Sequence, residues 1–128
     1  MIEQLPEKFG PLLGFQFIGE ITDEDCTEVF LPALRRAIKR FGVIRLLIDI
    51  TDIQSEGFGA MGEDLKEESR VLYIEREAII GDEDWEMRLA DVDHFFIFPN
   101  ADVRFFRENI RQDAWDWIRE GMPQVAGM

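Results

Sequence analysis

Near the middle of the chain the sequence reads Ile44-Arg45-Leu46-Leu47-Ile48-Asp49-Ile50, an almost unbroken run of branched aliphatic residues. A strand that is covered on both faces has such a continuous apolar sequence, because neither of its faces meets water. We therefore expect residues 44–50 to form the central strand of a parallel sheet, with amphipathic helices above and below it. This expectation places the chain in the α/β class.

A hairpin is predicted at the start of the chain. Residues 2–5 and 13–20 have the composition of short strands, and the second segment alternates between two sides with a period of two residues. The turn-forming residues Gly10 and Pro11 lie between them. The two segments are therefore expected to pair before the chain reaches the central strand.

A long amphipathic helix is predicted between the hairpin and the central strand. Thr22 can cap its first turn, and the three acids at 23–25 suit the positive end of a helix dipole. Apolar residues then recur at spacings of three and four as far as Gly42. Pro32 lies inside this stripe and predicts a kink, because proline has no amide hydrogen to donate.

Helix and strand patterns alternate through the second half of the chain. In order, we expect a turn at 52–57, a helix at 58–73, a strand at 77–81, a helix at 82–96, an edge strand at 102–106 and a last helix that begins at 109 or 112. The predicted order is ββαβαβαβα, in a mixed, mainly parallel sheet flanked by helices. We expect one domain at 1–120 and a C-terminal tail at 121–128.

The charge of the chain restricts its partners. Among 128 residues there are 14 basic and 27 acidic ones, which gives a net charge of −13. Such a chain repels phosphate backbones, so a nucleic-acid partner is not expected. The sequence contains no apolar run long enough to span a membrane and no signal peptide, and its lone Cys26 excludes an internal disulfide. We expect a cytoplasmic protein.

The order of elements and two short motifs resemble the SpoIIAA-like group of STAS domains. The motifs are Leu46-Leu47-Ile48-Asp49-Ile50-Thr51-Asp52-Ile53 and Ala78-Ile79-Ile80-Gly81-Asp82, the second followed by Trp85. The resemblance covers residues 1–119. It implies a mixed sheet flanked by helices and, as in some STAS domains, the binding of partner proteins or small ligands. The group is also similar in architecture to lipid-binding CRAL-TRIO domains.

The resemblance also points to a serine. Anti-sigma-factor antagonists of the STAS superfamily are switched by phosphorylation of a serine between the central strand and the next helix. Ser55 lies close to that place in this sequence. However, Glu56 precedes Gly57 where the antagonists carry serine. A phospho-regulated partner switch at Ser55 is therefore an alternative function that departs from the family pattern.

Few residues in the sequence suggest catalysis. Cys26 and His94 form the only conventional pair of nucleophile and base, but Cys26 lies on the apolar stripe of the first helix and is expected in the core. Asp91, Asp93 and His94 would serve a second alternative, a small metal-dependent hydrolase. Their spacing is not that of a regular metal site. We assign no catalytic residue, no metal and no cofactor.

Aromatic residues carry the leading hypothesis. The chain has 11 Phe and 3 Trp but 1 Tyr, and consecutive side chains at 95–98 would point in all directions around a helix end. Some of them should meet a second subunit, an apolar ligand or the chain's own tail, in that order of preference. We therefore expect a non-enzymatic STAS-like binding or regulatory module that forms a homodimer. Its ligand-binding or interface residues are predicted to be Phe58, Met61, Phe95, Phe96 and Phe98.

Overall fold

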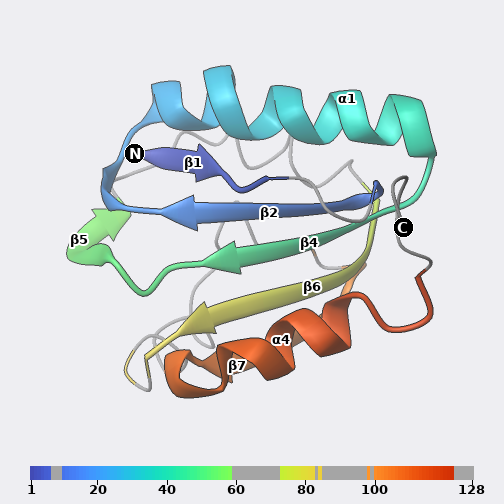
Figure 1. The fold of residues 1–128 in the computed structure, drawn as a ribbon. Helices are drawn as coiled ribbons and strands as arrows, with labels where there is room; N and C mark the ends of the chain where they lie inside the picture. The colour runs from blue at the N-terminus through green and yellow to red at the C-terminus, as the bar shows by residue number, and fades with distance from the viewer. Residues whose placement is uncertain (7–9, 59–72, 83, 85–97, 99, 123–128) are drawn as a thin grey trace.

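The fold is seen in a computed structural model that describes residues 1–6, 10–58, 73–82, 84, 98 and 100–122, with the backbone alone at 54–58. A five-stranded sheet has the strand order β1-β2-β4-β6-β7 (Figure 1). These strands are β1 (Ile2–Gln4), β2 (Leu12–Phe17), β4 (Ile44–Asp49), β6 (Ile74–Gly81) and β7 (Asp102–Arg107). The β1 strand is antiparallel to β2, which confirms the predicted hairpin, and the other pairs are parallel.

The predicted central strand lies where the sequence indicates. β4 pairs with β2 on one side and with β6 on the other. Since β1 lies beyond β2 and β7 beyond β6, β4 is the middle strand of the five. Leu46 and Ile48 belong to a large apolar cluster that includes residues of α1 (Leu31–Phe41), and we call this cluster the α1-side core. Leu47 points to the opposite face and packs in a second cluster with residues of α4 (Arg111–Ile118). The α/β class and the mixed, mainly parallel sheet are confirmed.

The first helical region begins as predicted but contains a wide turn. Thr22 and Asp25 form reciprocal hydrogen bonds, in which the Asp25 amide donates to the Thr22 hydroxyl at 3.2 Å and the Thr22 amide donates to the Asp25 carboxylate at 2.9 Å. A π-helical segment η1 (Asp25–Phe30) then runs directly into α1. Pro32 lies in the first turn of α1, where a missing amide hydrogen is tolerated. Pro32 thus stands at the start of the α-helical part, where π turns give way to α turns, rather than inside a continuous α-helix.

Helix α4 is held on the sheet by arginines. The short 3-10 turn η2 (Glu108–Ile110) leads into α4. The centre of the Trp117 ring in α4 lies 5.2 Å from the guanidinium carbon of Arg76 and 4.7 Å from that of Arg104. Arg45 of β4 donates to the main-chain oxygen of Ile118 at 3.0 Å, and Arg76 of β6 donates to that of Trp117 at 3.1 Å. These bonds satisfy carbonyls at the helix end that have no partner within the helix.

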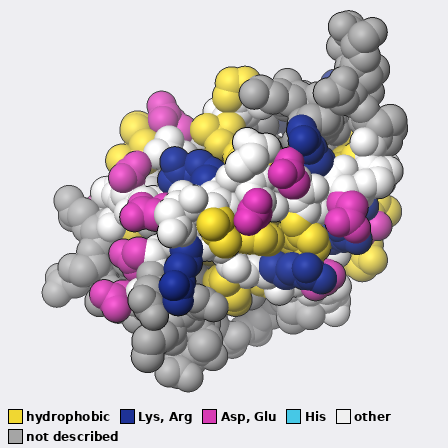
Figure 2. Space-filling model, turned by 60° about the horizontal axis from the view of Figure 1, so that its bottom comes forward, with side chains coloured by type: hydrophobic (Ala, Val, Ile, Leu, Met, Phe, Trp, Pro, Cys, Tyr) yellow, Lys and Arg dark blue, Asp and Glu magenta, His cyan; other side chains and the backbone are white. Residues whose placement is uncertain are grey.

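The charged and apolar side chains on one face of the molecule, and the apolar character of the described helices, bear on whether the chain spans a membrane. On the face seen in Figure 2, acidic and basic side chains alternate around a strip of hydrophobic ones. In the described part of the chain, no helix has the length and apolar character that crossing a membrane requires.

Three predicted boundaries are wrong. The strand expected at 13–20 ends at Phe17, because Gly19 has a left-handed φ of 63° and starts a separate strand β3 (Gly19–Ile21). The turn expected at 52–57 is mostly a strand, β5 (Ile53–Phe58), which pairs in parallel with β3 in a two-stranded sheet. β6 begins at Ile74 rather than at residue 77. Of the helices predicted at 58–73 and 82–96, residues 59–72 and 85–96 lie outside the described residues.

Candidate functional site

Glu77 is a fully buried acid in the middle of β6. Its side chain is 0% exposed, and the sheet register sets it between Leu46 of β4 and Val103 of β7. Both neighbours belong to or pack against the α1-side core, as does Ile79, the next residue of β6 on the same face. A carboxyl group therefore lies in the core with hydrocarbon on both flanking strands.

The Glu77 carboxyl is only half satisfied by hydrogen bonds. Its Oε1 accepts a 3.0 Å hydrogen bond from the Phe98 main-chain N–H. Its Oε2 has no hydrogen-bond partner among the described residues. Burial raises the pKa of Glu77 well above its ordinary value of 4.5, against the opposing effect of the Phe98 hydrogen bond. The neutral, protonated form is therefore favoured, and it can donate as well as accept a hydrogen bond.

Phe98 is the predicted site residue that the structure describes in full. Its side chain is 1% exposed and packs in the α1-side core, so it is not part of an exposed apolar face. Its main chain binds Glu77, and its carbonyl accepts from the Ala101 amide at 3.1 Å. Phe58 is the last residue of β5, and its Cα is paired with that of the buried Ile21. Met61, Phe95 and Phe96 lie outside the described residues.

Ser55 lies in the middle of β5 rather than in a loop. Its strand has six residues, whereas its partner β3 has three. The two strands pair at Gly19 with Ile53 and at Ile21 with Phe58, and their register shifts between these pairs. The backbone around Ser55 therefore belongs to the irregular part of this small sheet.

Polar side chains at the carboxyl end of β4 are paired with one another. The Asp49 carboxylate accepts from the Thr51 amide at 2.9 Å and forms an ion pair with Arg111 at 3.0 Å. Next to them, the Gln16 amide nitrogen donates to Asp52 at 2.9 Å. The carboxyl ends of parallel strands are the usual ligand sites of α/β folds. Here these contacts instead fix the turn that leads into β5 and tie the start of α4 to the sheet.

Cys26 is not set up as a nucleophile. Its side chain is 0% exposed in the α1-side core, as the sequence predicted. Burial, with smaller effects from Asp25 and Asp23, raises the pKa of the Cys26 thiol to about 12, so the reactive thiolate is not formed near neutral pH. Asp91, Asp93 and His94 lie outside the described residues. Within the residues that are described, no three His, Cys, Asp or Glu side chains are close enough to hold a metal ion.

Comparison with known proteins assigns the family. A model of the SpoIIAA-like family matches residues 12–119, which is most of the chain. The chain belongs to the SpoIIAA-like family. This SpoIIAA-like chain is also similar to the crystal structure of an uncharacterized protein from the DUF3478 family, from Shewanella loihica PV-4, which has a SpoIIAA-like fold. The two are 27% identical over 91% of this chain and 93% of that chain, with a TM-score of 0.60. No curated protein matches the sequence.

The family assignment confirms the resemblance seen in the sequence, but Glu77 was not predicted as a site residue. In the strand predicted at 77–81, Glu77 is the first residue, a position where an acidic side chain can reach the solvent. In this SpoIIAA-like fold β6 starts three residues earlier, so Glu77 lies inside the strand and between two others. The sequence did indicate that Glu77 could be buried. An acid directly before the apolar run Ala78-Ile79-Ile80 is exposed only if the strand starts at that acid, and it is covered if the strand starts earlier.

Proposed function

We propose that this SpoIIAA-like chain is a non-enzymatic binding module whose ligand is a small apolar molecule with one neutral oxygen group. The observation that carries the proposal is the fully buried Oε2 of Glu77, which has no partner among the described residues. Buried polar atoms in native proteins nearly always have a hydrogen-bond partner, and lacking one costs about 1–3 kcal/mol. A ligand hydroxyl or carbonyl would be that partner.

An apolar ligand fits the surroundings of Glu77 better than a water molecule or a cation does. A buried water needs two to four polar partners. The neighbouring Leu46, Ile79 and Val103 side chains offer none. A cation would require an ionised carboxylate, whereas burial favours the neutral acid. A molecule with one oxygen and a hydrocarbon body would satisfy the carboxyl and match the apolar neighbours together.

The aromatic residues singled out in the sequence would supply the rest of the binding surface. In this proposal the Phe98 main chain orients Glu77, and further apolar contacts come from Phe58, Met61, Phe95 and Phe96. The consecutive apolar residues Phe95-Phe96-Ile97-Phe98 cannot all face one ligand. We infer that those directed away from it contact a second copy of the chain, which would make the protein a homodimer.

The proposal is tested with a matched pair of probes. Native mass spectrometry of freshly purified protein reports the subunit number and any retained ligand, and we expect a dimer with an apolar adduct. Thermal unfolding is then measured with 1-dodecanol and with dodecane, which differ by one hydroxyl group. Dodecanol should stabilise the wild type more than dodecane does, and the Glu77→Leu variant should lose this preference. Equal effects of the two probes on the wild type would contradict the role of Glu77.

A phospho-regulated switch at Ser55 is the second candidate, and the irregular pairing of β5 favours it. Because the register shifts around Ser55, a negative charge there can displace the strand without breaking a regular ladder. The Ser55→Asp variant should then capture a different set of partner proteins from Ser55→Ala when both are used as bait in the same lysate. Identical partners for the two variants would remove this candidate.

A further inference from the structure

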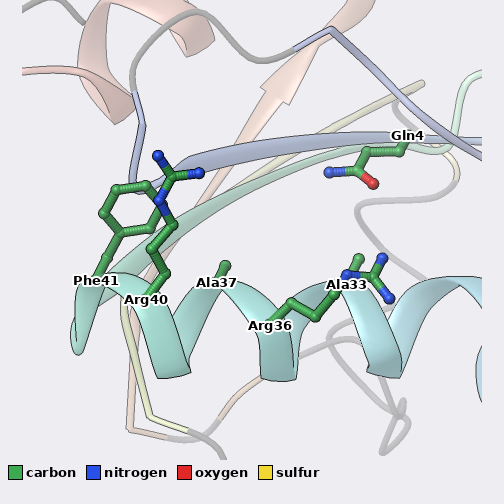
Figure 3. Close-up of a pocket in the computed structure, with 6 residues that line it drawn as sticks. All are labelled: Gln4, Ala33, Arg36, Ala37, Arg40 and Phe41. Atoms are coloured by element: carbon green, nitrogen blue, oxygen red, sulfur yellow. The ribbon is translucent and has the colours of Figure 1, made fainter.

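A groove of about 290 Å³ lies between β1 and α1 (Figure 3), and Glu77 is not among the residues that line it. Ala33 and Ala37 are buried at its base, and their small side chains leave the space open. Figure 3 shows the Arg40 guanidinium reaching from α1 toward the strands beside Phe41, while the Arg36 side chain runs along α1 toward Ala33, on the same part of the helix that lies below Gln4. The lining is completed by Phe41. We call this site the arginine groove.

The two arginines of the groove have no acidic partner in the part of the chain that the structure describes. Neither Arg36 nor Arg40 forms an ion pair with a described residue, and Arg40 instead lies 5.0 Å from the centre of the Phe41 ring. Other described arginines do form ion pairs, namely Arg45 with Glu75, Arg76 with Glu120, Arg111 with Asp49 and Arg119 with Asp116. Two exposed arginines one helical turn apart on α1 therefore carry positive charge that no described carboxylate neutralises.

The helix dipole does not account for this arrangement. Lys39 and Arg40 already provide positive charge in the last turn of α1, where the dipole is negative. Arg36 lies one turn earlier, and residues four apart on a helix share a face. The dipole favours cations all around the helix end, so it does not explain why two arginines line the same groove.

We propose that the arginine groove binds a small phosphate monoester. Two guanidinium groups present planar sets of N–H donors that match the oxygens of a phosphate dianion, and a bidentate arginine bond is among the strongest in proteins. The Gln4 amide adds a neutral donor and an acceptor on the opposite wall. The ring of Phe41 provides an apolar wall for the organic part of the ligand. The inference does not depend on the ligand proposed for Glu77.

The charge of the chain favours a small ligand over a phosphorylated surface. With a net charge of −13, the protein as a whole repels anionic membranes and other polyanions. A single phosphate group experiences mainly the nearby guanidinium groups, because salt screens charges beyond about 8–10 Å. The groove volume also suits a molecule smaller than a typical drug, whose pockets span about 300–1,000 Å³.

The test uses phenyl phosphate as the probe and calorimetric titration as the readout. We expect saturable binding to the wild-type protein, at least about tenfold weaker binding to Arg36→Gln and to Arg40→Gln, and weaker binding as salt is raised. Lys39→Gln is the matched control, because it removes the same charge from the same helix outside the groove lining. The side chains of Arg36, Arg40 and Lys39 are all exposed, so the three variants are expected to fold. Circular dichroism checks that they do.

Three results would overturn the inference. The first is no saturable binding of phenyl phosphate by a folded wild-type protein. The second is an equal loss in Lys39→Gln, which would mean that general charge and not the groove attracts the probe. The third is binding to vesicles that contain phosphatidic acid without binding to soluble phenyl phosphate, which would assign the arginines to a lipid surface.

Discussion

Replacing Glu77 with glutamine should change how the stability of the protein depends on pH. The pKa of Glu77 in the folded chain is raised well above its ordinary value of 4.5, chiefly by burial. Below the unfolded-state pKa the carboxyl is protonated in both states, so its full contribution to stability is present. As the pH rises toward the folded-state pKa, the unfolded chain releases the proton while the folded chain keeps it. Stability then falls by about 1.4 kcal/mol per pH unit.

Glu77→Gln removes this loss, because an amide does not titrate. Its carbonyl oxygen can still accept the hydrogen bond from the Phe98 amide, so the folded structure is expected to persist. The free energy of unfolding of wild type minus that of Glu77→Gln should therefore fall as pH rises. The fall should follow a slope of about 1.4 kcal/mol per pH unit between the unfolded-state pKa and the raised folded-state pKa, and should level off above it.

Urea unfolding followed by circular dichroism measures this difference at several pH values. Glu3→Gln is the matched control, because Glu3 is exposed on β1 and its replacement also removes one acid. The control should run parallel to the wild type across the range. Parallel curves for wild type and Glu77→Gln would show that Glu77 titrates normally, and the argument from a neutral buried carboxyl would then fail.

Three further predictions concern the core and the β4 turn. Cys26 should resist iodoacetamide at about pH 8 in the folded protein and react in urea, because burial raises the pKa of its thiol to about 12. Intact mass follows the labelling, and rapid labelling of the folded chain would refute this prediction. Leu46→Ala should cost about 2–5 kcal/mol in urea unfolding, whereas Val43→Ala, at a position that is 46% exposed, should cost less than about 0.5 kcal/mol. Asp49→Asn should cost about 1 kcal/mol through its partly exposed pair with Arg111, less in high salt, and a loss that ignores salt would count against an ionic contribution.

The centre of the fold was predictable because local sequence and tertiary environment agree there. Residues 44–50 are apolar at nearly every position, so any strand they form needs cover on both faces, and β4 has it. The same holds for the start of the first helix, where Thr22 and Asp25 carry their capping information within four residues. β5 lacks such local information. Its middle, Gln54-Ser55-Glu56-Gly57, reads as a turn, and it becomes a strand only because β3 lies beside it.

The candidate sites were harder to predict for a similar reason. Phe98 was singled out by its aromatic neighbours in the sequence, and the structure places it beside Glu77. The importance of Glu77 depends on its sheet register, which brings it between Leu46 and Val103. Arg36 reads in the sequence as one of several cations near a helix end. Its place in a groove depends on β1, more than 30 residues earlier in the chain, lying next to α1.

The two proposed sites differ in charge, because the Glu77 site is neutral and the arginine groove is positive. Experiments that vary the salt concentration can therefore separate them. A strongly acidic chain makes a further buried negative charge unfavourable, which supports a neutral Glu77 and a neutral ligand oxygen. The arginine groove instead depends on two solvent-exposed positive charges, whose attraction for phosphate weakens as salt screens it. Added salt should therefore weaken phenyl phosphate binding and leave the preference for dodecanol over dodecane unchanged. If both responses fell together with salt, one nonspecific surface effect would explain them better than two distinct sites.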